Sequence, residues 1–167
     1  MQANSLLFSA ESFRQVMGAF ATGVTIVTTR CGGTIHGLTA NSFCSVSLEP
    51  MLILVCVDKQ AFSHNLIARG RNFAVNILKA AQQDLAEKFS NNELNAKQRY
   101  EDLVYRTAVT GAPILEESLA WLDCELAAAH DGGDHDIFVG KVLALGKNES
   151  QPPLLYFQGR YQTLKLR

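Results

Sequence analysis

The chain has 167 residues and a formal net charge of -1, with 15 basic and 16 acidic side chains and no long run of either sign. This balance gives no electrostatic support for binding to nucleic acid or to a membrane surface. A chain of this length can bury about 70 % of its unfolded surface as one domain, and it is too short for two full nucleotide-binding domains. We therefore expect residues 1–167 to form a single domain.

The N-terminal part of the chain predicts an amphipathic helix and no targeting signal. MQANSLLFSAESF lacks a basic region and a long apolar core, and no stretch of the chain approaches the ~18 apolar residues of a membrane span. We therefore expect a cytoplasmic protein without a membrane segment. Ser9 is the expected N-cap of a helix over residues 10–20. The apolar stripe of this helix comprises Phe13, Val16, Met17 and Phe20.

A β-hairpin is predicted next. Gly23 opens the run VTIVTTR, whose β-branched residues favour a strand, and the turn follows at Cys31-Gly32-Gly33. Residues 34–38 return as the second arm, and the chain runs directly into the segment 37–58.

The segment 37–58, GLTANSFCSVSLEPMLILVCVD, predicts two adjacent strands over residues 42–48 and 51–57. The break falls at Glu49-Pro50, because proline donates no backbone hydrogen bond and biases the residue before it towards an extended conformation. The run MLILVCV is apolar without alternation, which predicts a strand covered on both faces.

Small polar side chains gather in the first half of this segment. Ser42, Ser45 and Ser47 are interleaved with apolar residues, just after Thr39 and Asn41. The pattern alone favours a hairpin whose serines face water. A ligand wall, in which hydroxyls and backbone N–H groups meet a phosphate or a ring edge, is the alternative.

The middle of the chain predicts two helices and a strand. A helix is expected over residues 61–69, with Phe62 and Leu66 on its inner face and Gly70 as its C-cap. FAVNIL, residues 73–78, predicts a strand, and a second helix is expected over residues 82–89. Residues 91–101 form the most polar part of the chain, and we expect them to be the least structured.

The last third of the chain predicts mainly strands. Residues 105–114 are expected to be extended, whereas residues 119–129 fit a helix by propensity and a strand by alternation. DGGDH, residues 131–135, predicts a turn before a long strand over residues 137–146, and the tail ends with a turn at Gln158-Gly159. Many strands with short connections predict a mainly β fold, an antiparallel barrel with a few flanking helices.

Nucleotide and metal motifs are scarce. The sequence contains neither G-x-G-x-x-G after a strand nor G-x-x-x-x-G-K-[ST], so any nicotinamide cofactor must bind without a Rossmann unit. The cluster from His130 to Asp136 is expected to be a flexible acidic turn rather than a metal site. We expect no zinc site or disulfide framework from the cysteines, since they contain no C-x-x-C pair.

Four motifs together resemble one known family. GLTANSFCSVSLEPMLILVCVD, GDH followed by IFVGKV, FRQVMGAFATGVTIVTT and PLLYFQGRYQTL are similar to segments of the short-chain flavin reductases, NAD(P)H:flavin oxidoreductases that serve two-component monooxygenases. The matches cover nearly all of residues 13–164, except for residues 91–97. The resemblance implies an FMN-binding split barrel, a Greek-key-like antiparallel β-barrel, and it favours a strand for residues 119–129.

The resemblance also implies a set of flavin-binding residues. One group runs along the ring and the ribityl chain, one holds the ribityl chain and the phosphate, and one lies opposite, with weaker candidates in the strand 73–78. These residues are Thr39, Ala40, Asn41, Ser42; Ser45, Val46, Ser47; Cys56, Val57, Asp58, Ser63; and the weaker Asn76 and Phe73, the last of which fits a core position better.

By the same resemblance, His135 lies beside the nicotinamide of NADH or NADPH, where its imidazole could orient the carboxamide or stack on the ring. Hydride transfer to FMN or FAD then needs no catalytic acid or base of the protein, since the protein stacks the two rings. The resemblance further implies a homodimer and a monooxygenase partner that receives reduced flavin. Two alternatives stay open: a non-catalytic flavin-binding sensor or electron carrier, and a split barrel that binds another ligand.

Overall fold

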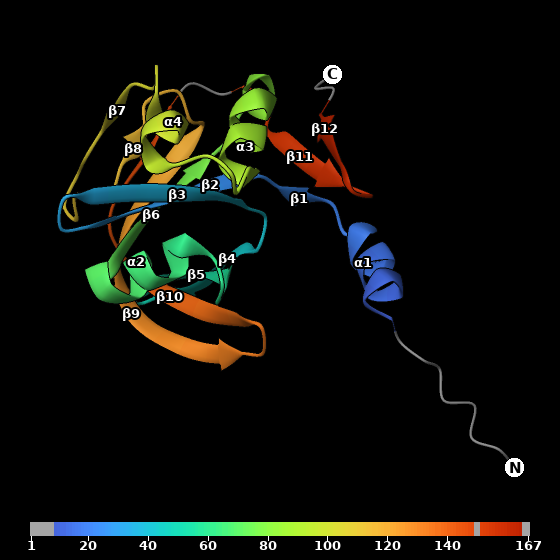
Figure 1. Ribbon diagram of the computed structural model, residues 1–167, viewed down its shortest axis with the longest axis horizontal. Helices are drawn as coiled ribbons and strands as arrows, with labels where there is room; N and C mark the ends of the chain where they lie inside the picture. The colour runs from blue at the N-terminus through green and yellow to red at the C-terminus, as the bar shows by residue number, and fades with distance from the viewer. Residues whose placement is uncertain (1–8, 149–150, 165–167) are drawn as a thin grey trace, which may run out of the picture.

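The computed structural model describes residues 9–148 and 151–164, and its main feature is a seven-stranded antiparallel sheet in the order β3-β2-β6-β9-β10-β5-β4 (Figure 1). The opening residues 1–8 lie outside this described part, so it does not test the absence of a targeting signal there. The sheet strands are β2 (Thr25–Cys31), β3 (Thr34–Ala40), β4 (Phe43–Leu48), β5 (Met51–Asp58), β6 (Asn72–Ile77), β9 (Ala120–Gly132) and β10 (His135–Lys147). The predicted hairpins and the strand over residues 119–129 are confirmed.

The connection between β3 and β4 requires the sheet to curl into a barrel. These two strands are its opposite edges, and only Asn41 and Ser42 separate them in the chain. A flat sheet of seven strands would hold its edges ~29 Å apart, whereas the three Cα steps from Ala40 to Phe43 span at most ~11 Å. The edges must therefore meet, which confirms the predicted mainly β barrel. Ser42 lies at the closure, where its carbonyl accepts a hydrogen bond from the Cys56 amide at 3.3 Å.

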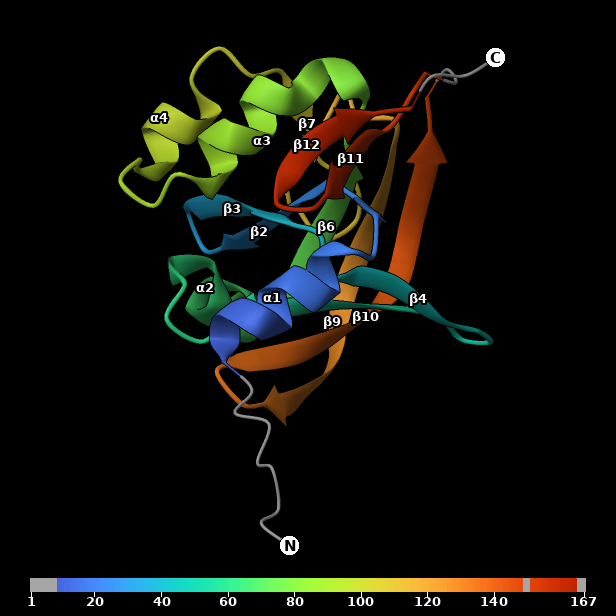
Figure 2. The same cartoon turned by 90° about the vertical axis from the view of Figure 1, so that its right-hand side faces the viewer.

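Two small sheets complete the strands. β11 (Leu154–Phe157) pairs with β12 (Arg160–Thr163) and with β1 (Thr22–Gly23), which confirms the predicted turn at Gln158-Gly159. β7 (Tyr105–Arg106) pairs with β8 (Ile114–Leu115). Figure 2 shows the β11–β12 hairpin close to α3 and the long β9–β10 hairpin extending along one side of the molecule.

In the part of the chain that the structure describes, four α-helices and one 3₁₀ helix flank the barrel. β3 runs between α2 on one side and α3 and α4 on the other in both views (Figures 1 and 2). The helices are α1 (Ala10–Gly18), α2 (Phe62–Gly70), the 3₁₀ helix η1 (Ala80–Gln82), α3 (Gln83–Ser90) and α4 (Ala96–Tyr100). α1 begins at the predicted Ser9 cap and buries none of its side chains. No helix in residues 9–148 and 151–164 is long and apolar enough to cross a bilayer.

Two predictions for α2 were wrong. Phe62 is 60 % exposed, whereas Leu66 is buried as predicted, together with Ile67. Gly70 is the last helical residue, and Arg71 is the C-cap, in a left-handed conformation at φ 53° with its amide bonded to the Ile67 carbonyl. Position 70 instead requires glycine because β2 lies too close for a side chain: a Cβ there would collide with the Arg30 carbonyl.

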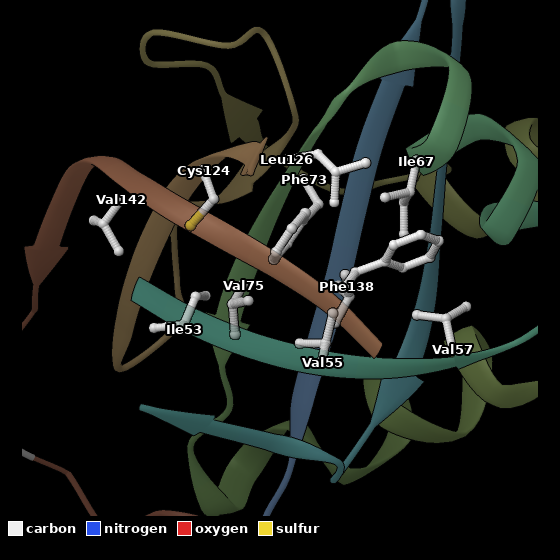
Figure 3. Close-up of a cluster of buried hydrophobic side chains, with 11 residues drawn as sticks. Ile53, Val55, Val57, Ile67, Phe73, Val75, Cys124, Leu126, Phe138 and Val142 are labelled. Atoms are coloured by element: carbon white, nitrogen blue, oxygen red, sulfur yellow. The ribbon is translucent and has the colours of Figure 1, made fainter. Parts of the chain in front are cut away.

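The main hydrophobic core fills the barrel, with Phe73 and Phe138 fully buried at its centre (Figure 3). Cys124 is part of this core, and burial raises the pKa of its thiol to about 12. β5 corrects another prediction, because its burial alternates. Ile53, Val55 and Val57 point into the core, while the opposite face of the strand is only half-buried within one chain.

Candidate functional site

A cleft of about 1070 Å³ lies where β3, the start of α2 and the α3–α4 segment come together. β3 and the two residues after it form the first wall, and the start of α2 forms the second. α3, α4 and the connection between them form the third wall. Three groups of residues line it: Thr34, His36, Gly37, Leu38, Thr39, Ala40, Asn41, Ser42; Cys56, Asp58, Gln60, Ala61, Phe62, Ser63; and Phe89, Ser90, Asn92, Glu93, Leu94, Asn95, Ala96, Arg99, with His135 added from β10.

The structure brings most of the predicted site residues to this one cleft. They come from three separate parts of the sequence, which the barrel closure and the β5–β10 pairing place side by side. The predicted residues in the cleft are Thr39, Ala40, Asn41, Ser42, Cys56, Asp58, Ser63 and His135.

Other predicted residues do not line this cleft, and their contact with a flavin stays a prediction. Ser45 and Val46 are exposed on β4, and Ser47 is half-buried on the same strand. Val57 is fully buried in the barrel core, because it alternates with Cys56 along β5. These residues belong to the sequence motif but do not line the cleft.

Asn76 is a buried structural residue. Its amide nitrogen donates to the Ile26 carbonyl at 3.1 Å, and its amide oxygen accepts from the Leu115 amide at 2.8 Å. The side chain therefore satisfies backbone groups in the interior, as a buried amide must. Phe73 is fully buried, as its core assignment predicted.

The chain that crosses from β3 to β4 is held by its own side chains. The Ser42 hydroxyl donates to the Cys56 carbonyl at 2.8 Å, and the Thr39 hydroxyl donates to the Ala86 carbonyl of α3 at 2.6 Å. Asn41 is exposed and bonded to the Thr22 hydroxyl at 3.2 Å through its amide nitrogen only. Its amide oxygen and second N–H are thus available to a ligand in the cleft.

The N-terminus of α2 forms the second wall. Ala61 occupies the N-cap position without a side-chain hydrogen bond, and the first turn contains no acidic residue. Such a helix end presents N–H groups and a partial positive charge. Ser63 lies in this first turn with its hydroxyl 2.5 Å from Nδ1 of His36. The arrangement suits an anionic group, and a phosphate is the ordinary ligand of this kind of site.

His36 is neutral at neutral pH. Burial, assisted by the nearby charge of Arg99, lowers the pKa of its imidazole to about 4. Its ring packs edge-on against Phe62, with the ring centroids 5.1 Å apart. This site therefore gains no positive charge from His36 under physiological conditions, and the ring serves as a neutral hydrogen-bond partner of Ser63.

The third wall corrects the expectation that residues 91–101 lack structure. α4 forms there, capped by Asn95, whose side chain accepts from the Gln98 amide at 3.0 Å. Arg99 is buried and donates to the carbonyls of Phe89, Asn91 and Leu94 at 2.5, 2.5 and 3.1 Å. One guanidinium thus ties the connection between α3 and α4 into a fixed shape.

His135, at the start of β10, lines the cleft next to the end of β5. β10 places it opposite Asp58 of β5, just after the Gly132-Gly133 turn. Its side chain is 43 % exposed, and Nδ1 lies 2.8 Å from a carboxylate oxygen of Asp134. This hydrogen bond to His135 holds the pKa of Asp134 below its usual value. The imidazole is oriented yet accessible to a ligand.

Comparisons with known proteins agree with this geometry. A profile of the flavin reductase like domain matches residues 17–165. The chain belongs to this flavin reductase family. It is 39 % identical, over 89 % of its length and 75 % of the relative, to HsaB of Rhodococcus jostii, the reductase subunit of a flavin-dependent monooxygenase. It is 38 % identical, over 90 % of its length and 83 % of the relative, to the NADH-dependent FMN reductase SmoA of Agrobacterium fabrum.

A solved flavin reductase has the same fold. The NADH:FAD oxidoreductase of Streptomyces globisporus, in complex with NAD and FAD fragments, superimposes with a TM-score of 0.86 at 35 % identity. The alignment covers 93 % of this chain and 92 % of that one. The split-barrel fold of this flavin reductase is therefore shown by its overall structure as well as by its motifs.

Sequence reasoning missed several residues of the flavin reductase cleft, among them His36 and Arg99. His36 precedes Thr39 on the same strand, and no local pattern distinguishes it from an ordinary strand residue. Arg99 had a detectable signal, because Asn95 followed by Gln98 is a capping pattern that predicts a helix start. In the described residues, no group of three or more His, Cys, Asp or Glu side chains converges as a metal site would require.

Proposed function

We propose that this chain is an NADH-dependent flavin reductase that transfers hydride to FMN or FAD and supplies the reduced flavin to a partner monooxygenase. One observation carries the proposal: a single cleft joins the Thr39–Ser42 wall, the uncapped start of α2 and His135. Relatives named as an NADH-dependent FMN reductase and a monooxygenase reductase subunit support the same activity. We place the protein in the cytoplasm, with NADPH as the less favoured donor.

The cleft residues fit a flavin. The start of α2 and the Ser63 hydroxyl would hold the phosphate, and the segment Thr39–Ser42 would run along the ribityl chain and ring edge. Typical ligand pockets measure ~300–1,000 Å³, so a cleft of about 1070 Å³ has room for a flavin and a stacked nicotinamide. Asn41 would supply a donor to the ring edge, where negative charge develops on reduction.

The protein's own chemical part is binding and orientation. A bound flavin and a bound nicotinamide supply the hydride acceptor and donor between them, and no protein group needs to move a proton. His36 is neutral and bonded to Ser63, which suits it to hold a hydroxyl rather than to act as an acid. His135 would orient the nicotinamide over the flavin, so that the reacting atoms lie about 3–3.5 Å apart.

The deciding experiment follows NADH oxidation by the purified protein with and without added FMN or FAD. We expect oxidation that depends on added flavin and follows saturation kinetics in both substrates. Flavin binding without NADH oxidation would contradict the proposal and identify a non-catalytic flavin-binding module. Absence of any flavin-dependent change in absorbance would instead indicate that the cleft takes a different ligand.

The assembly we propose is a homodimer. Phe13, Val16 and Phe20 of the α1 segment are 66, 71 and 70 % exposed. Leu48 and Met51, at the tip of the β4–β5 hairpin, are also exposed, and the outer face of β5 is only half-buried. Such a concentration of apolar surface is typical of an interface. Cys56 on that outer face also lines the cleft, so a second subunit would lie next to the flavin.

A further inference from the structure

Lys59 lies between residues that line the cleft but does not line it itself. These neighbours are Asp58, Gln60, Ala61, Phe62 and Ser63. Its side chain extends instead to the turn that connects β9 to β10. The loop that would hold the flavin phosphate is therefore linked through one residue to the turn that carries His135.

The contacts of Lys59 surround this turn. Its ammonium group donates to the Asp131 carboxylate and, at 2.6 Å, to the Gly133 carbonyl, and it lies 3.6 Å from the Asp136 carboxylate. Its backbone amide donates to the Asp134 carbonyl at 3.0 Å. The hydrogen bond to Asp131 raises the pKa of Lys59, and the same bond lowers the pKa of Asp131. Side chain and backbone of one residue thus hold both arms of the turn.

His64 supports the same turn from α2. Its Nε2 lies 2.7 Å from the Asp136 carboxylate, and its ring packs on Phe138 with the ring centroids 5.1 Å apart. Asp136 therefore receives contacts from both Lys59 and His64, and it directly follows His135 in β10.

Strand pairing holds the backbone on either side of the turn, because His135 pairs with Gly132 of β9 and with Asp58 of β5. Gly132 and Gly133 are exposed, and Gly133 has a positive φ of 89° with open space around its α-carbon. Two adjacent glycines at the end of the hairpin bring no side chains of their own, so the side-chain contacts that hold this end come from residues outside the glycine pair. Lys59 is the residue that supplies contacts to both ends of the glycine pair.

We propose that Lys59 is a positioning residue, which holds the Gly132–His135 turn so that His135 faces the nicotinamide in the flavin cleft. This inference rests on the proposed function, and it adds a residue that acts through His135 without touching either substrate. A half-buried lysine could alternatively contribute only to fold stability, as most surface ion pairs do to a small extent. The experiment must therefore separate positioning from stability.

The test compares Lys59→Met, His135→Ala and the double variant, with Lys141→Met as the matched control. Lys141 is an exposed lysine on the same strand as His135 and lies outside the cleft. We expect Lys59→Met to raise the KM for NADH about 3- to 10-fold, as the loss of a hydrogen bond would, and to change kcat less. The dissociation constant for FMN should change less than about twofold, and Lys141→Met should behave as wild type.

The double variant distinguishes the two roles. If Lys59 acts through His135, Lys59→Met should add less than about twofold to the effect of His135→Ala, because coupled residues are not additive. Lys59→Arg should restore much of the NADH affinity, since a guanidinium can donate to the same carboxylate and carbonyl.

Three results would overturn the inference: an unchanged KM for NADH in Lys59→Met, effects of Lys59→Met and His135→Ala that multiply in full, or equal losses of NADH and FMN affinity together with a lowered Tm. Normal NADH kinetics in His135→Ala would remove the nicotinamide contact and this inference with it. Flavin-dependent NADH oxidation by the wild-type protein would still support the proposed function in that case.

Discussion

Asn41 and Ser47 belong to the same sequence motif, but only Asn41 reaches the cleft. Asn41 lies at the barrel closure with half of its amide unpaired, whereas Ser47 lies further along β4, outside the cleft. A motif match therefore assigns a ligand to a stretch of chain, and the direction of each side chain decides which residues can contact it.

We expect Asn41→Leu to weaken FMN affinity about 2- to 10-fold, because one lost hydrogen bond is worth about 0.5–1.5 kcal/mol. Ser47→Ala should leave the affinity unchanged, since Ser47 does not line the cleft. Quenching of flavin fluorescence measures both dissociation constants. Equal losses in the two variants would mean that the flavin follows β4 instead of the cleft.

His36 predicts a pH dependence of stability in the ligand-free protein. Its folded-state pKa, about 4, lies below the ordinary value of 6.5. Above pH 6.5 the imidazole is neutral in both states, and as the pH falls the unfolded state takes up its proton first. His36 therefore lowers the free energy of unfolding progressively between pH 6.5 and about 4.

Denaturant unfolding of wild type and His36→Asn across this pH range measures the effect. Asparagine keeps a hydrogen-bond partner for Ser63 but does not titrate. The stability difference between the two proteins should shrink as the pH is lowered from 6.5 to about 4. A constant difference over this range would show that His36 titrates normally.

At the scale of elements, the α3–α4 segment depends on one buried cation. Arg99 has no acidic partner among its hydrogen bonds and is bonded to three backbone carbonyls. Burial lowers the pKa of its guanidinium, but arginine remains charged and its planar fork reaches several acceptors at once. The order of this wall of the cleft therefore depends strongly on the hydrogen bonds of Arg99.

We expect Arg99→Met to destabilise the fold by at least about 2 kcal/mol, because it leaves buried carbonyls without donors. Arg99→Lys should recover only part of this, since an ammonium group cannot match the fork geometry. Lys97→Met, an exposed change on the same helix, is the control. Thermal unfolding gives the stability, and hydrogen exchange of residues 90–95 reports the order of the wall. Wild-type protection in Arg99→Met would contradict this role.

At the scale of the whole molecule, exposed apolar surface lies on α1 and at the β4–β5 tip, on elements that the barrel does not cover. α1 is attached to the rest of the described chain at its end, where the Gly18 carbonyl accepts from the Gln158 amide at 2.9 Å. Figure 1 shows the helix extending away from the barrel. A second subunit would cover this helix.

We expect sedimentation equilibrium to give a dimer at micromolar concentration for the wild-type protein. The double variant Phe13→Ser, Val16→Ser should be monomeric, because it removes two of the four apolar side chains of the stripe without touching any buried side chain. A monomeric wild type would contradict the homodimer, and the cleft would then act within a single chain.

Local patterns in the sequence were sufficient for most elements of this flavin reductase. The glycine turns at Cys31-Gly32-Gly33 and Gln158-Gly159, the break at Pro50 and the β-branched runs predicted the strands, because turn and strand preferences depend on neighbouring residues. The motif from Gly37 to Asp58 indicated part of the cleft only through its resemblance to the flavin reductases, because its pattern alone favoured a hairpin whose serines face water.

Only the tertiary structure decided which side chains meet. The outward direction of Phe62, the interior role of Asn76 and the burial of Arg99 each depend on an element from elsewhere in the chain. Lys59 forms hydrogen bonds with a turn more than seventy residues later in the sequence, and these bonds depend on the pairing of β5 with β10. Burial and hydrogen bonding between distant segments are properties of the folded barrel, so no local pattern could encode them.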